Sequence, residues 1–160
     1  MMKKILLLAI GFLMTMTASA QFEQGKYYCN GSLTGINLSY SGAEKLSLGV
    51  EAKGGYLVAD NWMALVMAGY SHDEDVDDKF AVGVGGRYYI IQNGLYMGLN
   101  ARLVHGGSGY NDIMPGLELG YAFFLGKSVT IEPSVYYDQS IKNHSDYSKV
   151  GLRIGVGVYL

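Results

Sequence analysis

Strict alternation at the carboxyl end is the feature that most limits how this chain can fold. From residue 150 to residue 160 every even position is apolar, whereas the odd positions carry glycine, arginine or tyrosine. The apolar positions are Val150, Leu152, Ile154, Val156, Val158 and Leu160. Successive side chains of a β-strand point to opposite faces of a sheet. The segment therefore predicts a strand with one wholly apolar face.

The same alternation recurs along the chain and predicts eight strands. They cover residues 27–40, 46–56, 62–70, 80–90, 95–103, 113–123, 129–137 and 150–160. Strands of roughly 9–12 residues can cross a bilayer at a tilt. Beyond residue 20 no apolar run approaches about 18 residues, which excludes a helical membrane protein. The sequence therefore predicts an all-β fold.

Two of these strands have an ambiguous orientation. Residues 62–70 are apolar on both parities, so either set of side chains could face outward. Leu33 is out of phase with the apolar residues that follow it, which predicts a β-bulge near Gly31 or Gly35. Cys29, in the same strand, could face either way.

The connections between the predicted strands alternate in character. Tight turns are predicted at residues 59–61, 92–94 and 126–128, and mostly longer, more polar loops at 41–45, 71–79, 106–112 and 139–149. Short turns at one end and long loops at the other are typical of outer-membrane barrels.

The charges inside the strands all fall on the parity opposite the apolar residues. They are Glu51, Lys53, Arg87, Arg102, Glu118, Glu132 and Arg153. In a soluble sandwich or a lipocalin-like barrel this face would meet water. In a membrane barrel it would line the lumen, with the apolar face in lipid.

The composition of the charged face favours the membrane barrel. The face is otherwise rich in glycine, and its four basic and three acidic residues nearly neutralise one another, as buried charges must. On the lipid face each cation would cost about 2–4 kcal/mol at mid-bilayer. Eight strands leave an interior just wide enough for side chains to fill. We therefore predict an eight-stranded antiparallel up-and-down transmembrane β-barrel, whose lumen these charges fill as a structural network rather than as an open pore.

Aromatic residues gather near the strand ends and predict two interfacial girdles. Near the tight turns and chain ends lie Tyr27, Tyr28, Trp62, Tyr88, Tyr89, Tyr96, Phe123 and Tyr159. Near the long loops lie Tyr40, Tyr70, Phe80, Tyr136 and Tyr137.

Residues 1–20 predict a cleaved signal peptide. Two lysines precede an almost unbroken apolar stretch, and Ala18-Ser19-Ala20 has the small-x-small form that signal peptidase accepts. Cleavage after Ala20 would leave residues 21–160 as the barrel domain. Cys29 lies well beyond the predicted cleavage site, which disfavours a lipid anchor.

Three motifs carry a resemblance to a known family. The segments Gly55–Trp62, Gly69–Ser71 and Val84–Tyr89 resemble the small outer-membrane β-barrel domain family, eight-stranded barrels akin to the membrane domain of outer membrane protein A. The resemblance covers residues 25–160. It implies an integral outer-membrane protein of a Gram-negative bacterium, with both termini in the periplasm and the long loops outside. It also implies that the barrel-assembly machinery reads the last strand, although Leu160 stands where a terminal phenylalanine is commonest.

The sequence predicts no catalytic residue, cofactor or metal site. The three histidines fall in or beside the long loops, but no family-specific spacing joins them to a nucleophile: His72, His105 and His144. Carboxylates at positions 73, 75 and 77 weakly resemble a calcium loop, but Asp78 stands where such a loop needs glycine. Polar residues concentrate in loops of any kind.

The predicted function is a structural or surface-interaction role exerted through the extracellular loops. A narrow channel or a conduit for small apolar solutes is the alternative, and a lipopolysaccharide-modifying enzyme and a soluble lipocalin-like binder are also considered. The expected partners are outer-membrane lipid and lipopolysaccharide, and the barrel-assembly machinery during insertion. A net charge of -2 argues against a nucleic-acid partner. We expect a monomer, and the sequence identifies no surface ligand.

Overall fold

The computed structural model describes residues 22–36, 47–73, 76–90, 94–107, 109–142 and 148–160. Its strands are β1 (Tyr27–Ile36), β2 (Ser47–Ala59), β3 (Trp62–Asp73), β4 (Val76–Tyr89), β5 (Leu95–Gly106), β6 (Tyr110–Tyr121), β7 (Phe123–Phe124), β8 (Val129–Asp138) and β9 (Lys149–Tyr159). None of the described residues belongs to a helix long and apolar enough to cross a membrane. The signal peptide predicted at residues 1–20 lies outside the described residues.

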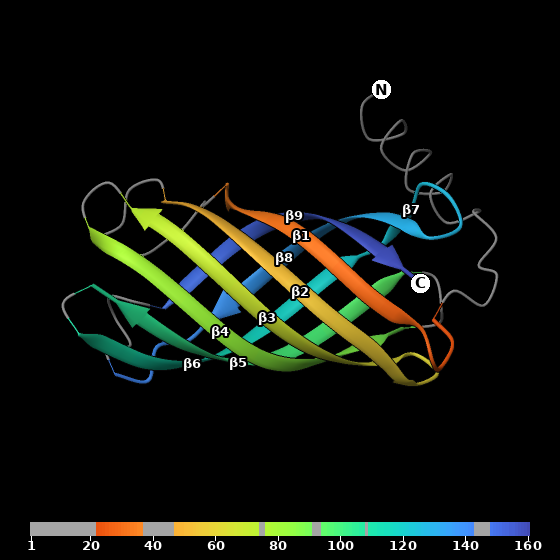
Figure 1. Cartoon of the computed structure of the whole chain (residues 1–160), viewed down its shortest axis with the longest axis horizontal. Helices are drawn as coiled ribbons and strands as arrows, with labels where there is room; N and C mark the ends of the chain where they lie inside the picture. The colour runs from red at the N-terminus through yellow and green to blue at the C-terminus, as the bar shows by residue number, and fades with distance from the viewer. Residues whose placement is uncertain (1–21, 37–46, 74–75, 91–93, 108, 143–147) are drawn as a thin grey trace, which may run out of the picture.

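The strands form one closed antiparallel barrel (Figure 1). Consecutive strands pair from β1 through to β6, β8 pairs with β9, and β9 returns to pair with β1. The two-residue β7 prolongs β6 beyond Ala122, and both pair with β8. The wall therefore counts eight strands, which confirms the predicted fold class.

The barrel has two different ends. The carboxyl terminus and the start of β1 lie at the same end as the tight turns, which we call the turn end (Figure 1). Tyr27 and Leu160 exchange backbone hydrogen bonds of 2.9 Å there. The strand ends at Ile36, Asp73, Gly106 and Asp138 lie at the opposite end, which we call the loop end (Figure 1).

Alternate residues of each strand face the lumen and the outside of the barrel. Along β8 buried and more exposed residues alternate, with Thr130, Glu132 and Ser134 facing in. In β3, whose orientation the sequence left open, Met63 and its alternate neighbours are buried, whereas Trp62 and its alternate neighbours face out. Pairing with β2 and β4 settles the orientation, because opposite residues of neighbouring strands must share a face.

Local irregularities agree in part with the sequence. Two predicted turns contain a residue with positive φ: Asn61 at 66° and Gly94 at 96°. The register of β1 against β9 shifts between Thr34 and Ile36, which confirms a bulge at the Gly35 position. Cys29 is exposed on the outer face.

The prediction of long loops at 71–79 and 106–112 was wrong in extent. Strand β3 continues to Asp73 and β4 begins at Val76, while β5 reaches Gly106 and β6 starts at Tyr110. These residues look like loop because they are polar. They form strands because the barrel wall extends beyond the apolar band, where an outward-facing residue meets water rather than lipid.

Glycines on the inner face make room for large lumen side chains. A Cβ on Gly120 would lie 2.5 Å from Cζ of Tyr96 and 2.8 Å from Cβ of Ser134. A Cβ on Gly151 would lie 2.6 Å from Cζ of Tyr136. The glycine-rich parity of the sequence therefore reflects a lumen packed to contact distance.

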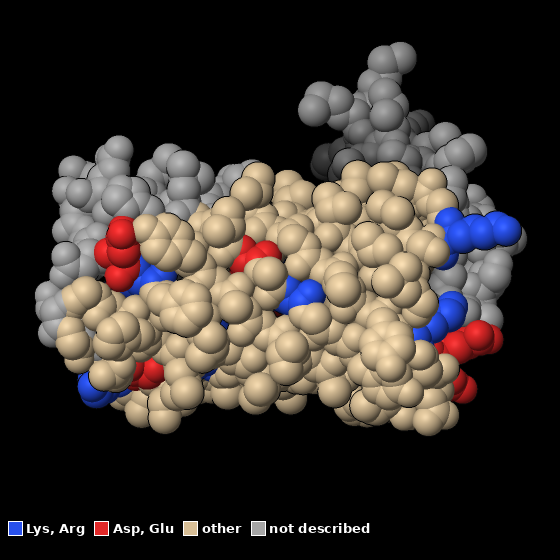
Figure 2. Space-filling view, viewed as in Figure 1, with Lys and Arg blue, Asp and Glu red and all other residues tan. Residues whose placement is uncertain are grey.

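The outer face is apolar over most of its height. Figure 2 shows one face of the barrel with charged atoms mainly toward its two ends, apart from a small acidic and basic area near the middle. Large apolar side chains are exposed around the wall, including Val66, Leu99, Leu117 and Val156. Such a face suits hydrocarbon and not water.

Candidate functional site

The seven charged residues that the sequence assigns to the lumen all lie inside the barrel. Six of them are at most 7% exposed, and the side chain of the seventh, Arg102, is 11% exposed. They come from six different strands. In every one of these strands the charged residues point inward, so they meet in the lumen. The lumen is therefore the candidate functional site.

In the half of the lumen nearer the loop end, each arginine contacts two carboxylates. Arg102 lies 3.1 Å from Asp138 and 3.0 Å from Glu51. Arg153 lies 3.4 Å from the same Glu51 and 3.0 Å from Glu118. Positive and negative groups therefore alternate along the barrel.

Toward the turn end the alternation continues through Glu118. Lys53 Nζ lies 2.7 Å from Glu118 and 3.4 Å from Glu51. Arg87 lies 3.4 Å from Glu118 and 2.9 Å from Glu132. Glu118 thus joins three cations. Unpaired buried charges would be costly, and this continuous pairing keeps each of these charges beside an opposite one.

Arg87 is the most densely surrounded cation. Its Nη1 donates hydrogen bonds to the hydroxyl oxygens of Tyr28 at 3.1 Å and Tyr89 at 3.2 Å. Its guanidinium carbon lies 3.8 Å from the ring centroid of Tyr96. Tyr28 in turn donates to Glu132 at 2.5 Å. The tyrosines fill the space around the ion pair and provide it with further hydrogen bonds.

The sequence analysis missed an eighth charged member, Asp138. It balances the network at four cations and four carboxylates, because its partner is Arg102. Its position has the same parity as Glu132, which is the signal that could have identified it. It was missed because the predicted strand ended at residue 137, whereas β8 ends at Asp138.

The assignment of all strand-end aromatics to girdles was partly wrong. Five of the tyrosines point into the lumen and are at most 6% exposed: Tyr28, Tyr89, Tyr96, Tyr136 and Tyr159. Tyr89 shares the parity of Arg87, and Tyr159 shares that of Arg153. The direction in which a side chain points follows its odd or even position in the strand rather than its residue type. The hydroxyl groups make inward tyrosines compatible with a charged interior.

Other aromatics do face outward near the strand ends. At the turn end Tyr27 packs against Tyr56 and Trp62 against Tyr88, with ring centroids 5.1 Å and 4.8 Å apart. Near the loop end Tyr70 and Phe80 are exposed. Tyr40 lies outside the described residues.

A second missed feature closes the turn end. Phe22, which precedes β1, is fully buried and stacks on Tyr89 with centroids 3.7 Å apart and planes 12° from parallel. Its ring also contacts Phe124 and Tyr159 edge-on at 5.6 Å and 5.5 Å. An aromatic residue just before the first strand carries no period-two signal, so alternation could not reveal this plug.

Backbone hydrogen bonds hold the segment that carries Phe22. Its carbonyl oxygen accepts from the N–H of Asn61 at 2.9 Å, and the N–H of Gly25 donates to Leu57 at 2.9 Å. The backbone N–H of Gln24 donates to the carboxylate of Asp60 at 2.9 Å. The plug is therefore tied to the turn between β2 and β3.

Most buried polar atoms without a hydrogen-bond partner lie away from this plug, and Asn61, in the turn that binds the plug, is the exception. Among the described residues they are Glu51 Oε1, Asn61 Oδ1, Asn100 Oδ1, Arg102 Nε and Nη2, Ser134 Oγ, Asp138 Oδ1, and Arg153 Nε and Nη2. We call Glu51, Asn100, Arg102, Ser134, Asp138 and Arg153 the loop-side cluster. Several of these atoms still contact an opposite charge, as Glu51 and Arg153 do. Their hydrogen-bonding capacity is nevertheless incompletely used.

The candidate residues in and beside the loops are not assembled into a catalytic group in the described part of the chain. His105 is exposed, and its Nδ1 lies 2.7 Å from Oδ1 of Asn111. Asp112 is buried on the other face and accepts a hydrogen bond from Ser140. No cluster of three potential metal ligands occurs among the described residues. The side chains of His72, Ser108, His144, Ser145 and Asp146 lie outside them.

The sequence matches no protein-family model and no curated protein. Solved structures do match. The N-terminal β-barrel domain of Pseudomonas aeruginosa OprF aligns with a TM-score of 0.63 and 14% identity, covering 86% of this chain and 98% of that one. Yersinia pestis outer membrane protein Ail, in a phospholipid bilayer nanodisc, aligns with a TM-score of 0.58 and 13% identity over 86% of this chain and 100% of that one.

Neisserial surface protein A gives a similar result. It aligns with a TM-score of 0.56 and 15% identity, covering 83% of this chain and 95% of that one. At such identities the likeness concerns the fold. The wall is closed, the lumen is charged and the outer face is apolar, as described above. Together with these features, the likeness shows that this chain has the fold of the small eight-stranded outer-membrane β-barrels, as the sequence resemblance implied.

Proposed function

We propose that the protein is a monomeric outer-membrane barrel with a closed interior, exported through a signal peptide at residues 1–20, and that it acts through its loop end. The observation that carries the proposal is the filling of the lumen at the turn end. There Arg87, Glu132 and the surrounding tyrosines bond to one another, none of them is among the described residues whose buried side-chain atoms lack a hydrogen-bond partner, and Phe22 packs beneath them. A barrel with such an end offers no evident path for a solute.

The outer face supports a location in a membrane. Its outward positions are apolar over most of the wall, and aromatic pairs such as Trp62 with Tyr88 lie at the turn end. The partners that follow are membrane lipid and lipopolysaccharide around the wall and, during insertion, the barrel-assembly machinery. No enzymatic role is proposed.

Fractionation combined with gel electrophoresis tests the barrel itself. We expect the protein in the outer-membrane fraction and a band that shifts on boiling, because a closed barrel resists detergent until it is heated. A protein found in the periplasm without a heat-dependent shift would contradict the proposal and favour the lipocalin-like alternative.

Epitope insertion tests which end faces outward. A tag inserted between Glu74 and Asp75, in the β3–β4 connection, should be labelled by antibody on intact cells. A tag inserted between Gly126 and Lys127, in the turn before β8, should be labelled only after the outer membrane is permeabilised. The reverse pattern would place the turns outside and overturn the assignment.

A narrow channel is the second candidate, because the loop-side cluster has unused hydrogen-bonding capacity that water could occupy. Planar-bilayer recordings separate the two. We expect no reproducible conductance from the folded protein, and regular current steps would favour the channel.

A further inference from the structure

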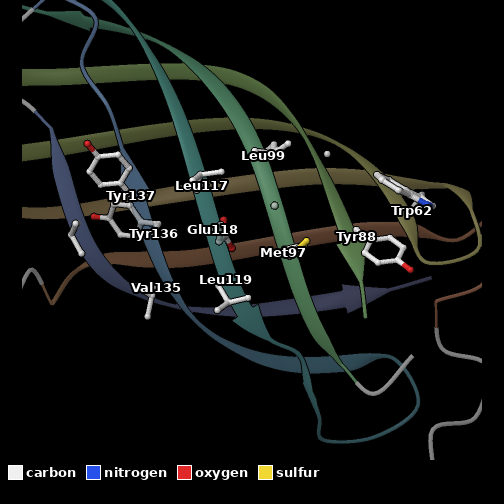
Figure 3. Close-up of a pocket in the computed structure, with 13 residues that line it drawn as sticks. Trp62, Tyr88, Met97, Leu99, Leu117, Glu118, Leu119, Val135, Tyr136 and Tyr137 are labelled. Carbon is white, nitrogen blue, oxygen red and sulfur yellow. The ribbon is translucent and has the colours of Figure 1, made fainter. Parts of the chain in front are cut away.

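The lipid-facing wall contains a groove that the lumen does not explain. It has a volume of about 840 Å³ and runs across the outside of β4, β5, β6 and β8, from Trp62 of β3 to Val150 of β9 (Figure 3). Outward side chains line it, among them Met97, Leu99, Leu117, Leu119 and Val135. A hollow in this face meets hydrocarbon, because the neighbouring outward positions are all apolar.

The two ends of the groove differ from its middle. Trp62 and Tyr88 lie at the turn end with ring centroids 4.8 Å apart, and Tyr137 lies toward the other end (Figure 3). Tryptophan and tyrosine combine an apolar ring with a hydrogen-bonding group and favour the level of lipid headgroups. An apolar trough with polar-tipped aromatics at its end matches the profile of a lipid molecule.

Gly86 is the residue that leaves the groove hollow. It lies on the outer face directly opposite Leu99 of β5. A Cβ on Gly86 would meet only the carbonyl oxygen of Met63, at an ordinary 3.7 Å. Several inward glycines differ, because a Cβ there would collide with the packed lumen, as at Gly120. Glycine weakens a strand interior, and in strands it often marks a bulge, a tight bend, or a close approach by a ligand or another backbone.

We propose that this groove binds one acyl chain of a glycerophospholipid, with its headgroup beside Trp62 and Tyr88. The proposal rests on the proposed location of the barrel in a membrane. A phospholipid fits better than a second barrel, because a slender chain fills a trough whereas a second barrel would present a convex wall. Gly86 allows the chain to reach the strand backbone, and Leu99 and Met97 flank it.

The chain contains a built-in reporter, because Trp62 is its only tryptophan. The folded protein in detergent micelles is titrated with phosphatidylethanolamine carrying brominated acyl chains, and the quenching of Trp62 fluorescence is followed. A binding site predicts quenching that saturates near about one lipid per protein at low lipid content. Lipid that only surrounds the wall would quench in proportion to its mole fraction in the micelle.

Gly86→Leu and Gly54→Leu form the matched pair of variants. Both glycines face outward, and a Cβ on Gly54 meets only Val66 at 3.5 Å, but Gly54 does not line this groove. We expect Gly86→Leu to weaken the saturable phase at least about tenfold and Gly54→Leu to leave it unchanged. Leu99→Ala, which removes a flanking contact without adding bulk, should weaken it about threefold or more.

Three results would overturn the proposal. These are proportional quenching in the unaltered protein, equal effects of Gly86→Leu and Gly54→Leu, or a dimer in native mass spectrometry that Gly86→Leu abolishes. The heat-dependent gel shift is recorded for each variant to show that it has folded. If Gly86→Leu does not fold, the effect of Leu99→Ala on the saturable quenching tests the proposal. Absence of the shift in the unaltered protein would contradict the membrane barrel itself, whereas a normal shift with proportional quenching contradicts only the lipid site.

Discussion

Both halves of the lumen pair arginine with carboxylate, but different side chains surround the ion pairs. At the turn end, which we call the turn-side cluster, Phe22, Tyr28, Arg87, Tyr89, Tyr96, Glu132 and Tyr159 pack around one ion pair. Glu132 accepts hydrogen bonds there from Tyr28, Tyr159, Arg87 and Thr130. The loop-side cluster has ion pairs of similar length but many unused donors and acceptors.

The difference teaches that ion pairing alone does not close a barrel. Tyrosine rings occupy the space between charged groups at the turn end, and their hydroxyls use the remaining hydrogen-bonding capacity. In the loop-side half the ring of Tyr136 lies 4.3 Å from the guanidinium carbon of Arg153, but donors and acceptors remain there that water would satisfy. We therefore expect the turn-side cluster to determine stability and closure, and the loop-side cluster to be hydrated.

The largest expected effect compares the two arginines. Arg87→Met should cost about 3–5 kcal/mol, because it leaves Glu132 buried without its cation. Arg102→Met should cost clearly less, since its side chain is 11% exposed against 1% for Arg87, and Glu51 keeps Lys53 and Arg153 as neighbouring cations. Urea titration of the detergent-folded barrel, followed by the heat-shifted gel band, measures both. An equal or larger cost for Arg102→Met would remove the distinction between the clusters.

Removal of the plug should have the next largest effect. Phe22→Ala deletes the ring that stacks on Tyr89, and a buried phenylalanine lost in this way costs about 3 kcal/mol. The same urea titration measures it. Leu125→Ala, an exposed apolar residue at the same end, is the control and should change stability little. Equal costs for the two variants would mean that the plug does not stabilise the turn end.

Two glycines compare how tightly the halves are packed. Gly120→Ala should cost about 1–3 kcal/mol, because the new methyl group would collide with the Tyr96 ring and Ser134 Cβ. Gly116→Ala should cost less, since the nearest atoms are the flexible ends of Asp138 and Asn100. The free energies of unfolding of the two variants, from the same urea titration, measure these costs. A larger cost at Gly116 would show that the loop-side cluster is the more rigid half.

The last prediction uses conservative substitutions to cysteine, which should change stability least. The reaction rate of each new thiol then reports how accessible each half of the lumen is to water. In a Cys29→Ser background, Ser134→Cys should react with a hydrophilic methanethiosulfonate at least about tenfold faster than Thr130→Cys. Thr130 is fully buried and donates to Glu132 at 2.8 Å, whereas Ser134 Oγ lacks a partner. Mass spectrometry over time follows the modification. Comparable rates would contradict selective hydration of the loop side.

Most of the wall could be predicted from the sequence because alternation is a local property. Each strand reveals its two faces without reference to its neighbours, so Glu51 and Arg153 could be assigned to one face although 101 positions separate them. The ambiguous β3 shows the limit of this reasoning. Both its faces are apolar, and only pairing with β2 and β4 decided that Met63 and Met67 point inward.

Strand ends were harder to predict for a related reason. Where the wall rises beyond the lipid, both faces become polar and the period-two contrast disappears. Asp138 was missed at such an end, as were the strand residues at Asp73 and Tyr110. The inward tyrosines were misassigned because their residue type, which suits an interface, was given more weight than their parity.

The sequence by itself determined the class of fold, the number of strands and the parity of the charges, because these follow from side-chain alternation along single strands. The tertiary structure alone decided which charges meet, how Phe22 closes one end and where the outer wall is hollow. These features depend on the register between strands and on the space across a narrow lumen, to which residues far apart in the sequence contribute together.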